Sequence, residues 1–296
     1  MPNKLQETIL GYSKLKERIE GKSDSTEERK KVFKNVKEIE ARVSPTYLKY
    51  IKKFFDRVIY HLYDDIIFDD STVNLKELLK KHLVVLVPNH QSHADYVAIN
   101  YMFYKRYKVP VYAAGGKNLN LPLLGFLFRR VGCFFIRRSF ASDITYKLTL
   151  EAYLYHLLKT GKVIEFFFEG GRSRTGKLLA PRFGLYRMLI DAHLELSRET
   201  DKRLVFIPVS IAHEYIPETK TLARELESGA KKKESFRHLF SLLGLFSRQL
   251  GSIHIKLGEE VEVAPFSADT SPDTVKREIE YLAFKCFRKV GENMLV

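Results

Sequence analysis

From residue 83 onward, short runs of consecutive apolar residues alternate with longer segments whose apolar residues recur at helical spacing. The short runs have the length and composition of strands, and they cover residues 83–87, 110–113, 133–136, 163–168, 204–211 and 253–257. The longer segments predict helices at residues 96–107, 143–159, 183–196, 236–249 and 272–290. This alternation predicts an α/β fold with a mixed sheet flanked by helices.

The first 75 residues differ from the rest, because helical spacing runs through them with breaks at Ser23-Asp24-Ser25 and Ser44-Pro45. We therefore expect a helical N-terminal region over residues 1–75 and an α/β domain over residues 76–296. Residues 47–68 place aromatic and aliphatic side chains on one helical face and cations elsewhere. We expect this face to pack against the main domain, with a membrane surface as the alternative.

The charge balance is strongly basic, since 50 Lys and Arg face 36 Asp and Glu for a net charge of +14. Such a balance favours an anionic membrane surface, a phosphorylated substrate or nucleic acid as partner. The basic residues follow no zinc-finger, KH or RRM pattern, so we do not expect nucleic acid. Two cysteines, the lack of a signal-peptide pattern and the lack of any apolar stretch of about 18 residues predict a cytoplasmic protein that contacts a membrane only peripherally.

The segment directly after the run at 83–87 carries the first candidate chemistry. Here His90 and Asp95 have the residue types of a general base and of the carboxylate that orients it. His and Asp after a strand also serve as ordinary helix-capping residues, so the pair alone leaves both interpretations open. A separation of five residues does not place both side chains on one helical face, so the segment must straddle a turn and a helix start.

A second candidate site follows the run at 163–168. The loop at residues 169–177 contains three glycines and the cations Arg172, Arg174 and Lys177. Glycines let backbone amides approach an anion, and guanidinium groups make forked hydrogen bonds to phosphate. The spacing also fits a nucleotide-binding P-loop, but Leu178 replaces the hydroxyl residue that would hold magnesium and Pro181 follows where a helix should begin. The loop therefore predicts a phosphate site that is not an ATPase site.

Three further observations limit or extend these candidates. The run at 133–136 ends in Arg137 and Arg138, which either add cations to the anion site or face solvent. The run at 204–211 continues into polar residues, which fits a core strand with a functional rim. His90, His93 and Asp95 could share a metal ion, yet the chain has no H-E-x-x-H or C-x-x-C pattern, and we expect neither a metal nor a resident cofactor.

Four blocks in order resemble the glycerol-3-phosphate and dihydroxyacetone-phosphate 1-O-acyltransferases, a family within the glycerophosphate acyltransferases that carries an H-x4-D motif. They span about residues 84–217 and read Asn89-His90-Gln91-Ser92-His93-Ala94-Asp95, then Ala113-Ala114-Gly115-Gly116-Lys117-Asn118-Leu119-Asn120 leading into Gly132-Cys133-Phe134-Phe135-Ile136-Arg137-Arg138, then Phe168-Glu169-Gly170-Gly171-Arg172-Ser173-Arg174-Thr175-Gly176-Lys177, and Ile207-Pro208-Val209. The resemblance implies a glycerolipid acyltransferase-like fold.

The resemblance also implies a reaction, the first step of phospholipid synthesis. A fatty acyl group would move from acyl-CoA or acyl-carrier-protein, as co-substrate, to the hydroxyl of glycerol 3-phosphate or a related acceptor. His90 would be the general base and Asp95 its orienting carboxylate. The residues implied in substrate binding are Arg137, Arg138, Glu169, Gly170, Gly171, Arg172, Ser173, Arg174 and Lys177.

Two alternatives stay open at this point. Enzymes that acylate lysophosphatidate resemble E-G-T-R-S in the third block, whereas this chain has Gly171 at the third position, which favours a small unacylated acceptor. The rival from another class is a noncatalytic protein that binds an anionic membrane or nucleic acid through its basic surface.

Overall fold

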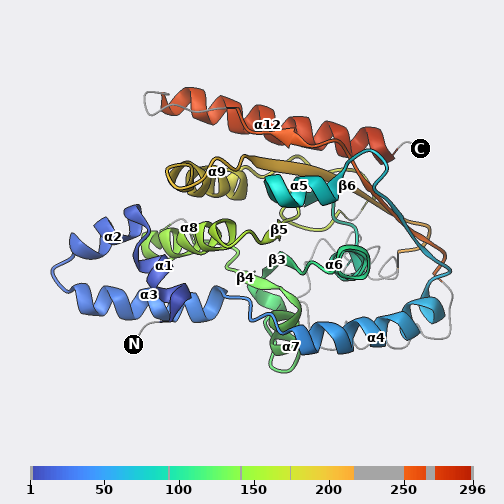
Figure 1. The fold of residues 1–296 in the computed structure, drawn as a ribbon, viewed down its shortest axis with the longest axis horizontal. Coiled ribbons are helices and arrows are strands. Elements are labelled where there is room, and N and C mark those ends of the chain that lie inside the picture. The colour runs from blue at the N-terminus through green and yellow to red at the C-terminus, as the bar shows by residue number, and fades with distance from the viewer. Residues whose placement is uncertain are drawn as a thin grey trace.

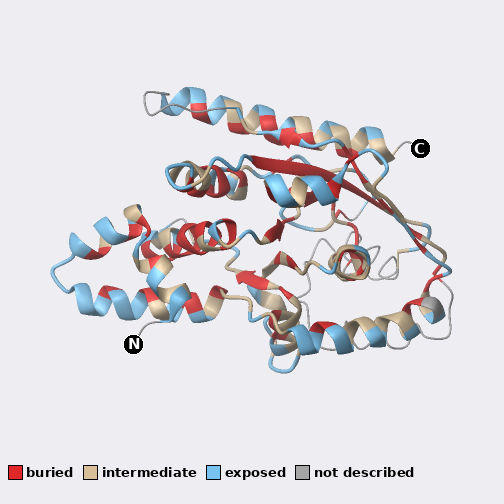
Figure 2. Ribbon diagram, in the orientation of Figure 1, coloured by how far each residue is buried: buried red, intermediate tan, exposed pale blue. Residues whose placement is uncertain are grey.

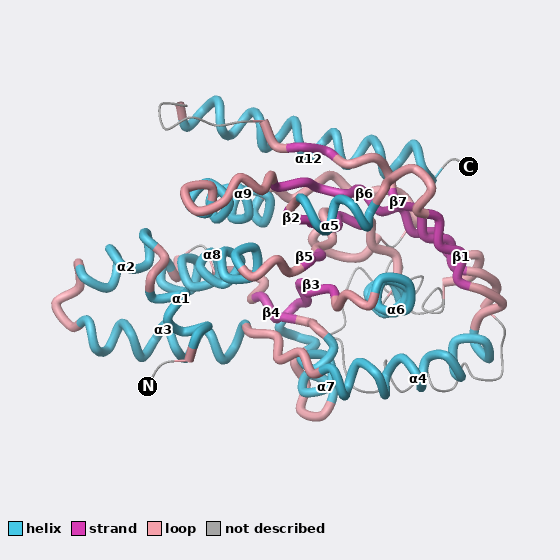
Figure 3. Tube along the Cα trace, viewed as in Figure 1, coloured by secondary structure: helices cyan, strands magenta, loops and turns pink. Residues whose placement is uncertain are grey.

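The computed structural model describes residues 3–92, 94–140, 142–173, 175–216, 250–264 and 271–294. These residues form an eight-stranded sheet in the order β1-β7-β6-β2-β5-β3-β4, with β8 paired to β6 (Figure 3). The strands are β1 (Ile66–Asp69), β2 (Leu83–Pro88), β3 (Val111–Gly116), β4 (Phe134–Ile136), β5 (Val163–Glu165), β6 (Leu204–His213), β7 (Ile253–Leu257) and β8 (Val261–Glu262). Paired strands are parallel, except that β6 runs antiparallel to β7 and β8.

Helices cover both faces of this sheet (Figure 1). They are α1 (Lys4–Leu10), α2 (Ser13–Glu20), α3 (Ser25–Ile39), α4 (Pro45–Leu62), α5 (Leu75–Lys81), α6 (Ala94–Tyr107), the 3-10 helix η1 (Lys117–Leu119), α7 (Leu124–Val131), α8 (Ile144–Lys159), α9 (Gly184–Leu196) and α12 (Pro272–Met294). Buried residues of α1, α2, α3, α8, α9 and α12 form one core, and those of α4, α5 and α6 form another.

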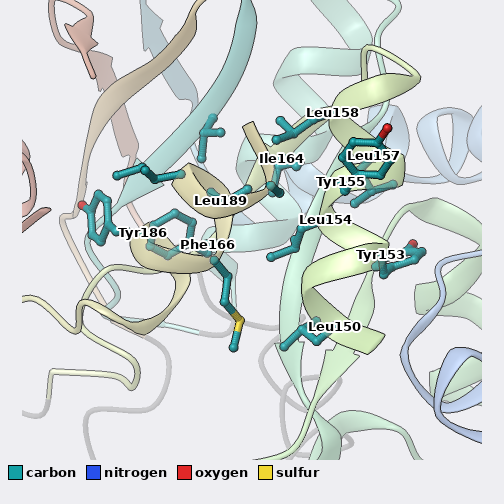
Figure 4. Close-up of a cluster of buried hydrophobic side chains, with 14 of the residues drawn as sticks. Leu150, Tyr153, Leu154, Tyr155, Leu157, Leu158, Ile164, Phe166, Tyr186 and Leu189 are labelled. Atoms are coloured by element: carbon teal, nitrogen blue, oxygen red, sulfur yellow. The ribbon is translucent and has the colours of Figure 1, made fainter. Parts of the chain in front are cut away.

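The two cores meet at β2, where every residue from Leu83 to Pro88 is buried. The neighbouring strand β6 is also buried along most of its length (Figure 2). Leu83, Val85 and Val87 belong to one core, whereas Val84 and Leu86 belong to the other. Successive strand residues point to opposite faces, so a strand covered on both sides is apolar throughout. In Figure 4, leucine and tyrosine side chains of α8 pack beside Ile164 of β5 and Leu189 of α9.

The strands predicted from apolar runs are present with shifted ends. β5 ends at Glu165 instead of residue 168, and β6 continues to His213. The prediction of one helix over residues 47–68 is wrong at its end: α4 stops at Leu62, and β1 follows and pairs with β7. Asp64 and Asp65 separate the two elements, and both suit a break better than a helix interior. The helix predicted at 236–249 lies outside the described residues.

The N-terminal helices share the core of the sheet. Ile9, Leu15 and Val32 are fully buried in the same cluster as β2 and α8. The hydroxyl of Tyr12 donates to Glu151 of α8, and Lys14 Nζ lies 2.7 Å from the same carboxylate. On α4 the expected packing holds for Ile59, which is buried, but Phe54 is 53% exposed. The division at residues 75 and 76 stays a prediction, and β1 on its N-terminal side belongs to the sheet.

Candidate active site

The candidate pair lies where β2 ends and α6 begins, at the carboxyl edge of the parallel strands. This edge is where α/β folds place their ligands, because loops and helix starts converge there. β2 ends at Pro88, and Asp95 is the second residue of α6. Asn89 between them is fully buried: its side-chain Nδ2 donates to Ile211 O (3.0 Å), and Ile211 N donates to its Oδ1 (2.7 Å). This amide fastens the end of β6 to the end of β2.

Asp95 orients His90 and also closes the turn that precedes α6. Its Oδ2 lies 2.8 Å from His90 Nδ1 and accepts hydrogen bonds from Gln91 N (2.7 Å) and Ser92 N (2.9 Å). One carboxylate therefore contacts both the imidazole and the backbone amides of the turn, and its role in orienting a base stays a prediction. As expected from the spacing, the two side chains meet across a turn and a helix start.

The second oxygen of Asp95 contacts a residue to which sequence reasoning gave no role. His213, the last residue of β6, places Nε2 2.6 Å from Asp95 Oδ1, and both side chains are fully buried. Burial alone would raise the pKa of Asp95, but hydrogen bonds with His213 and His90 outweigh it and hold that pKa well below its usual range. Asp95 is therefore ionised. An ionised carboxylate only accepts hydrogen bonds, so Nδ1 of His90 is the donor in this contact.

His90 reaches the surface from this buried setting. Its side chain is 13% exposed, while that of Asp95 is fully buried. The imidazole stacks on Phe167, with ring centroids 3.9 Å apart and planes 22° apart. Stacking and the Asp95 contact hold the ring on two sides, while part of it stays exposed to solvent.

The loop at residues 169–177, which we call the arginine loop, contacts His90 directly. Ser173 N donates to His90 O (2.7 Å), and Ser173 Oγ donates to Lys177 O (2.6 Å). Gly170 has φ of +67°, a backbone conformation that favours glycine. Arg172 is half-buried, Lys177 is exposed, and Arg174 lies outside the described residues. The structure thus brings the first and third sequence blocks together.

Two more carboxyl groups lie near Asp95. Glu169 at the start of the arginine loop is buried, and burial raises its pKa to about 7, with a smaller contribution from the charge of Asp95 and an opposing one from backbone hydrogen bonds at Leu179 and His90. Glu165 at the end of β5 is fully buried, and burial with the charge of Asp95 raises its pKa well above the usual value. The net pKa shifts of these groups are thus opposite, since despite burial the hydrogen bonds of Asp95 lower its pKa, whereas burial raises that of Glu165.

Comparison with known proteins places this geometry in a family. Residues 70–212 match the model of the acyltransferase family, and residues 222–295 match that of the glycerol-3-phosphate acyltransferase C-terminal region. A glycerol-3-phosphate acyltransferase of Pseudomonas fluorescens strain Pf-5 is 36% identical over 217 residues, 72% of this chain and 26% of the relative. One from Pseudomonas syringae pv. tomato is 37% identical over 205 residues, 69% and 24% of the two chains. The chain belongs to the glycerol-3-phosphate acyltransferase family.

This family member spans about a quarter of the length of the curated relatives that it matches. Among solved structures, the 1-acyl-sn-glycerophosphate acyltransferase from Thermotoga maritima matches 95% of this chain and 93% of its own. Its sequence identity is 16% and its TM-score is 0.38. The described helices include none that is long and apolar enough to cross a membrane.

The cations after β4 are placed differently from those of the arginine loop. The Arg137 guanidinium lies 2.7 Å from Glu38 and 2.8 Å from Asp143, and it stacks 4.0 Å from the ring centre of Tyr146. Arg138 is exposed. Arg137 therefore joins α3 to the start of α8, while β5 and β3 separate β4 from β2 in the sheet. These contacts do not bring Arg137 to His90, and its expected part in phosphate binding stays a prediction.

An apolar pocket lies between α4, α6, α7 and β3. It begins one residue after Asp95 along α6, with Tyr96, Val97 and Asn100. The other lining residues are Leu48, Ile51, Lys52, Phe55, Tyr101, Tyr104, Ala113, Leu127, Phe128, Val131 and Cys133. Sequence reasoning missed this pocket because its walls come from four separate segments that share no motif.

The residues that could share a metal ion are His90, His93 and Asp95. His93 lies outside the described residues. Within the described part of the chain, no group of three His, Cys, Asp or Glu side chains is arranged to hold a metal ion. The contacts of Asp95 instead join it to two imidazoles and two backbone amides.

Proposed function

We propose that this chain transfers a fatty acyl group from an acyl thioester to a hydroxyl of glycerol 3-phosphate. The observation that carries the proposal is that the oriented base and the cationic loop form one unit, because Ser173 N donates to the backbone oxygen of His90. An acceptor whose phosphate is bound by the loop would present its hydroxyl to His90. The printed name of the relatives, glycerol-3-phosphate acyltransferase, supports this acceptor.

In the proposed reaction, His90 Nε2 takes the proton of the acceptor hydroxyl as its oxygen attacks the thioester carbonyl. Asp95, 2.8 Å from Nδ1, stabilises the imidazolium that forms. The tetrahedral intermediate then collapses, the carbon–sulfur bond breaks, and the imidazolium returns its proton to the departing sulfur. Products are the ester and the free thiol, and the enzyme regains its starting protonation state.

The cations of the arginine loop are the proposed phosphate ligands. Arg172 and Lys177 lie one and four residues from Ser173, the residue that contacts His90. Arg174 belongs to the same proposal by its sequence position. A guanidinium pairs with two phosphate oxygens at once, so this loop suits a phosphate better than a neutral acceptor.

The acyl chain is proposed to occupy the apolar pocket along α6. Burial of hydrocarbon is favourable by about 0.8 kcal/mol for each CH₂ group, so a fatty chain gains affinity from such a lining. Tyr96 and Val97 connect the pocket to the helix start that holds Asp95. The carrier that delivers the chain is either CoA or acyl-carrier-protein, and both are anionic partners that suit a net charge of +14.

Peripheral contact with an anionic membrane at its cytoplasmic face is proposed for the surface shared by α4 and α7. Tyr50 (68% exposed), Phe54 (53%), Leu123 (74%) and Phe126 (48%) lie on it, and the exposed cations of α4 are Lys49, Lys53 and Arg57. Apolar side chains with neighbouring cations suit anionic lipid. Sedimentation with vesicles of phosphatidylglycerol and of phosphatidylcholine tests this contact. Equal loss from both supernatants, or from neither, would contradict it.

The function is tested by mass-spectrometric product analysis with purified protein. Glycerol 3-phosphate, dihydroxyacetone phosphate and lysophosphatidate serve as acceptors, each with acyl-CoA and with acyl-carrier-protein as donor. We expect an acylated glycerol 3-phosphate with at least one donor. Product from lysophosphatidate alone would move the assignment to that acceptor, and tight RNA or vesicle binding without any product would favour the noncatalytic alternative.

A further inference from the structure

His213 holds the oxygen of Asp95 that the proposed reaction does not use. Its Nε2 lies 2.6 Å from Asp95 Oδ1, although the two residues are 118 positions apart in the chain. Its side chain is fully buried, so it does not reach the acceptor or the thioester. Any influence of His213 on the reaction must therefore act through Asp95.

The end of β6 places the His213 side chain against Asp95. Val205, Ile207, Val209 and Ile211 all belong to the core on the α6 side of the sheet, and strand alternation puts His213 on that same face. Asn89 fixes the backbone of Ile211 through two hydrogen bonds, two residues before His213. The first residue of the sequence block that carries His90 thus fixes the strand that carries His213.

The carboxylate needs this contact for physical reasons. Asp95 Oδ2 has three partners, namely His90 Nδ1 and the amides of Gln91 and Ser92, whereas the contact of Oδ1 is with His213. A buried carboxylate oxygen that loses its donor is strongly destabilised, so the group would rotate or take up a proton. Either change would weaken the contact that keeps the His90 proton on Nδ1.

We propose that His213 is a positioning residue that locks the Asp95 carboxylate so that Oδ2 faces His90 Nδ1. The Nε2 lone pair of His90 then points to the acceptor hydroxyl in every turnover. This inference rests on the proposed acyl transfer for its kinetic consequence, but the contact and its effect on His90 are properties of the folded protein alone.

The kinetic experiment compares His213→Leu, which removes the donor, with His213→Gln, whose amide nitrogen reaches about as far as Nε2. We expect His213→Leu to lower kcat about 30-fold with both KM values within about twofold of wild type, because a displaced catalytic group costs up to about 100-fold. His213→Gln should recover most of that loss. The matched control is His254→Leu on the neighbouring strand β7, where the side chain is half exposed and activity should not change. Wild-type kcat in His213→Leu would overturn the proposal.

A double-mutant cycle tests whether His213 acts through Asp95. Asp95→Asn alone should lower kcat strongly, and adding His213→Leu should lower it little further, since the group through which His213 acts is already altered. Multiplicative losses would mean that His213 acts by another route, such as general stability. Circular dichroism and melting curves show whether each variant folds. If His213→Leu does not fold, His213→Asn, whose shorter amide does not reach Oδ1, replaces it.

Nitrogen NMR of the histidine rings gives a readout that does not depend on turnover. Wild type should show His90 with its proton on Nδ1, and a folded His213→Leu protein should show a mixture of both tautomers. An unchanged His90 tautomer in that variant would overturn the positioning role, whatever the kinetics show. Conversely, a protein that transfers no acyl group but shows the tautomer change would refute the proposed function and leave the positioning role in place.

Discussion

The candidate site has two halves, the buried half around His90 and Asp95 and the open half formed by the arginine loop, and they are built in opposite ways. Around Asp95 the side chains are buried, and both oxygens of its carboxylate are bound by imidazoles or backbone amides. The arginine loop instead carries exposed glycines and an exposed Lys177, and Ser173 N of this loop donates a hydrogen bond to His90 O. The difference teaches that the contacts of Asp95 are made within the protein, whereas the arginine loop exposes its glycines and Lys177 to solvent, where a charged ligand can reach them.

The largest effect should come from the buried half. His90→Ala removes the proposed base while Asp95 keeps His213 and two amides, so the fold should survive. We expect kcat to fall by about 10⁴-fold or more, as for other oriented imidazole bases. Steady-state acyl transfer and a melting curve measure the two properties separately.

The matched control for that change is His61→Ala, an exposed histidine near the end of α4. It should leave both activity and melting temperature at wild-type values. If His90→Ala retains even a tenth of the wild-type rate, His90 is not the base. The contacts around His90 and Asp95 would then stabilise the fold without a part in the reaction.

The next effect tests the open half. Arg172→Ala should raise the KM for glycerol 3-phosphate about 10- to 100-fold, because a guanidinium–phosphate pair contributes about 1.5–3 kcal/mol. The KM for the acyl donor should change little. Arg172→Lys should lie between the two, since an ammonium group cannot pair with two oxygens at once. Arg198→Ala, an exposed arginine just past α9, is the control. An unchanged acceptor KM would remove Arg172 from the site.

The same contrast explains how much of the molecule the sequence predicted. Strands such as β2 are apolar on both faces because they are covered on both sides, so their runs stand out. The pair of His90 and Asp95 stands out because both lie within seven residues. β1 was missed because it is short and follows an amphipathic helix, and its partner β7 lies nearly 190 residues along the chain.

Long-range partners carry no local signal. His213 lies 118 residues from Asp95, so nothing near the first block indicates that it holds the second oxygen. A signal did exist in strand alternation, which puts position 213 on the face of Ile211, but the face that α6 covers is known only from the fold. The partners of Arg137 were equally hidden, since Glu38 lies 99 residues before it in a region predicted only as helical.

A pH experiment examines Glu169, which starts the arginine loop and lies near Asp95. Burial raises the pKa of Glu169 from 4.5 to about 7, so at intermediate pH the folded state binds more protons here than the unfolded chain does. The stability that this neutral carboxyl contributes is fully present below pH 4.5 and is lost as the pH rises through 7. We expect Glu169→Gln to be stabilised relative to wild type as the pH rises from about 5 to about 8.

Urea unfolding of the two proteins at several pH values measures that difference. Comparing them cancels the other titrating groups, such as His156, whose pKa burial lowers to about 4. A constant difference in unfolding free energy across this pH range would mean that Glu169 is already ionised in the folded protein, as a solvent-exposed carboxylate would be.

The smallest expected effect tests whether every cation that the sequence suggests as a phosphate ligand binds the acceptor. Arg137 is held by Glu38 and Asp143 and stacks on Tyr146, with its side chain 25% exposed. Arg137→Ala should therefore lower the unfolding free energy by about 1–2 kcal/mol and leave the acceptor KM unchanged, whereas Arg172→Ala should do the reverse. Melting curves and acceptor titrations of both variants check this, and the control expected to change neither is Arg29→Ala, an exposed arginine on α3. If the acceptor KM rises in Arg137→Ala as it does in Arg172→Ala, Arg137 is a phosphate ligand after all. A residue that only joins α3 to α8 makes the same contacts in the free and in the acceptor-bound enzyme, so its loss should not change the acceptor KM.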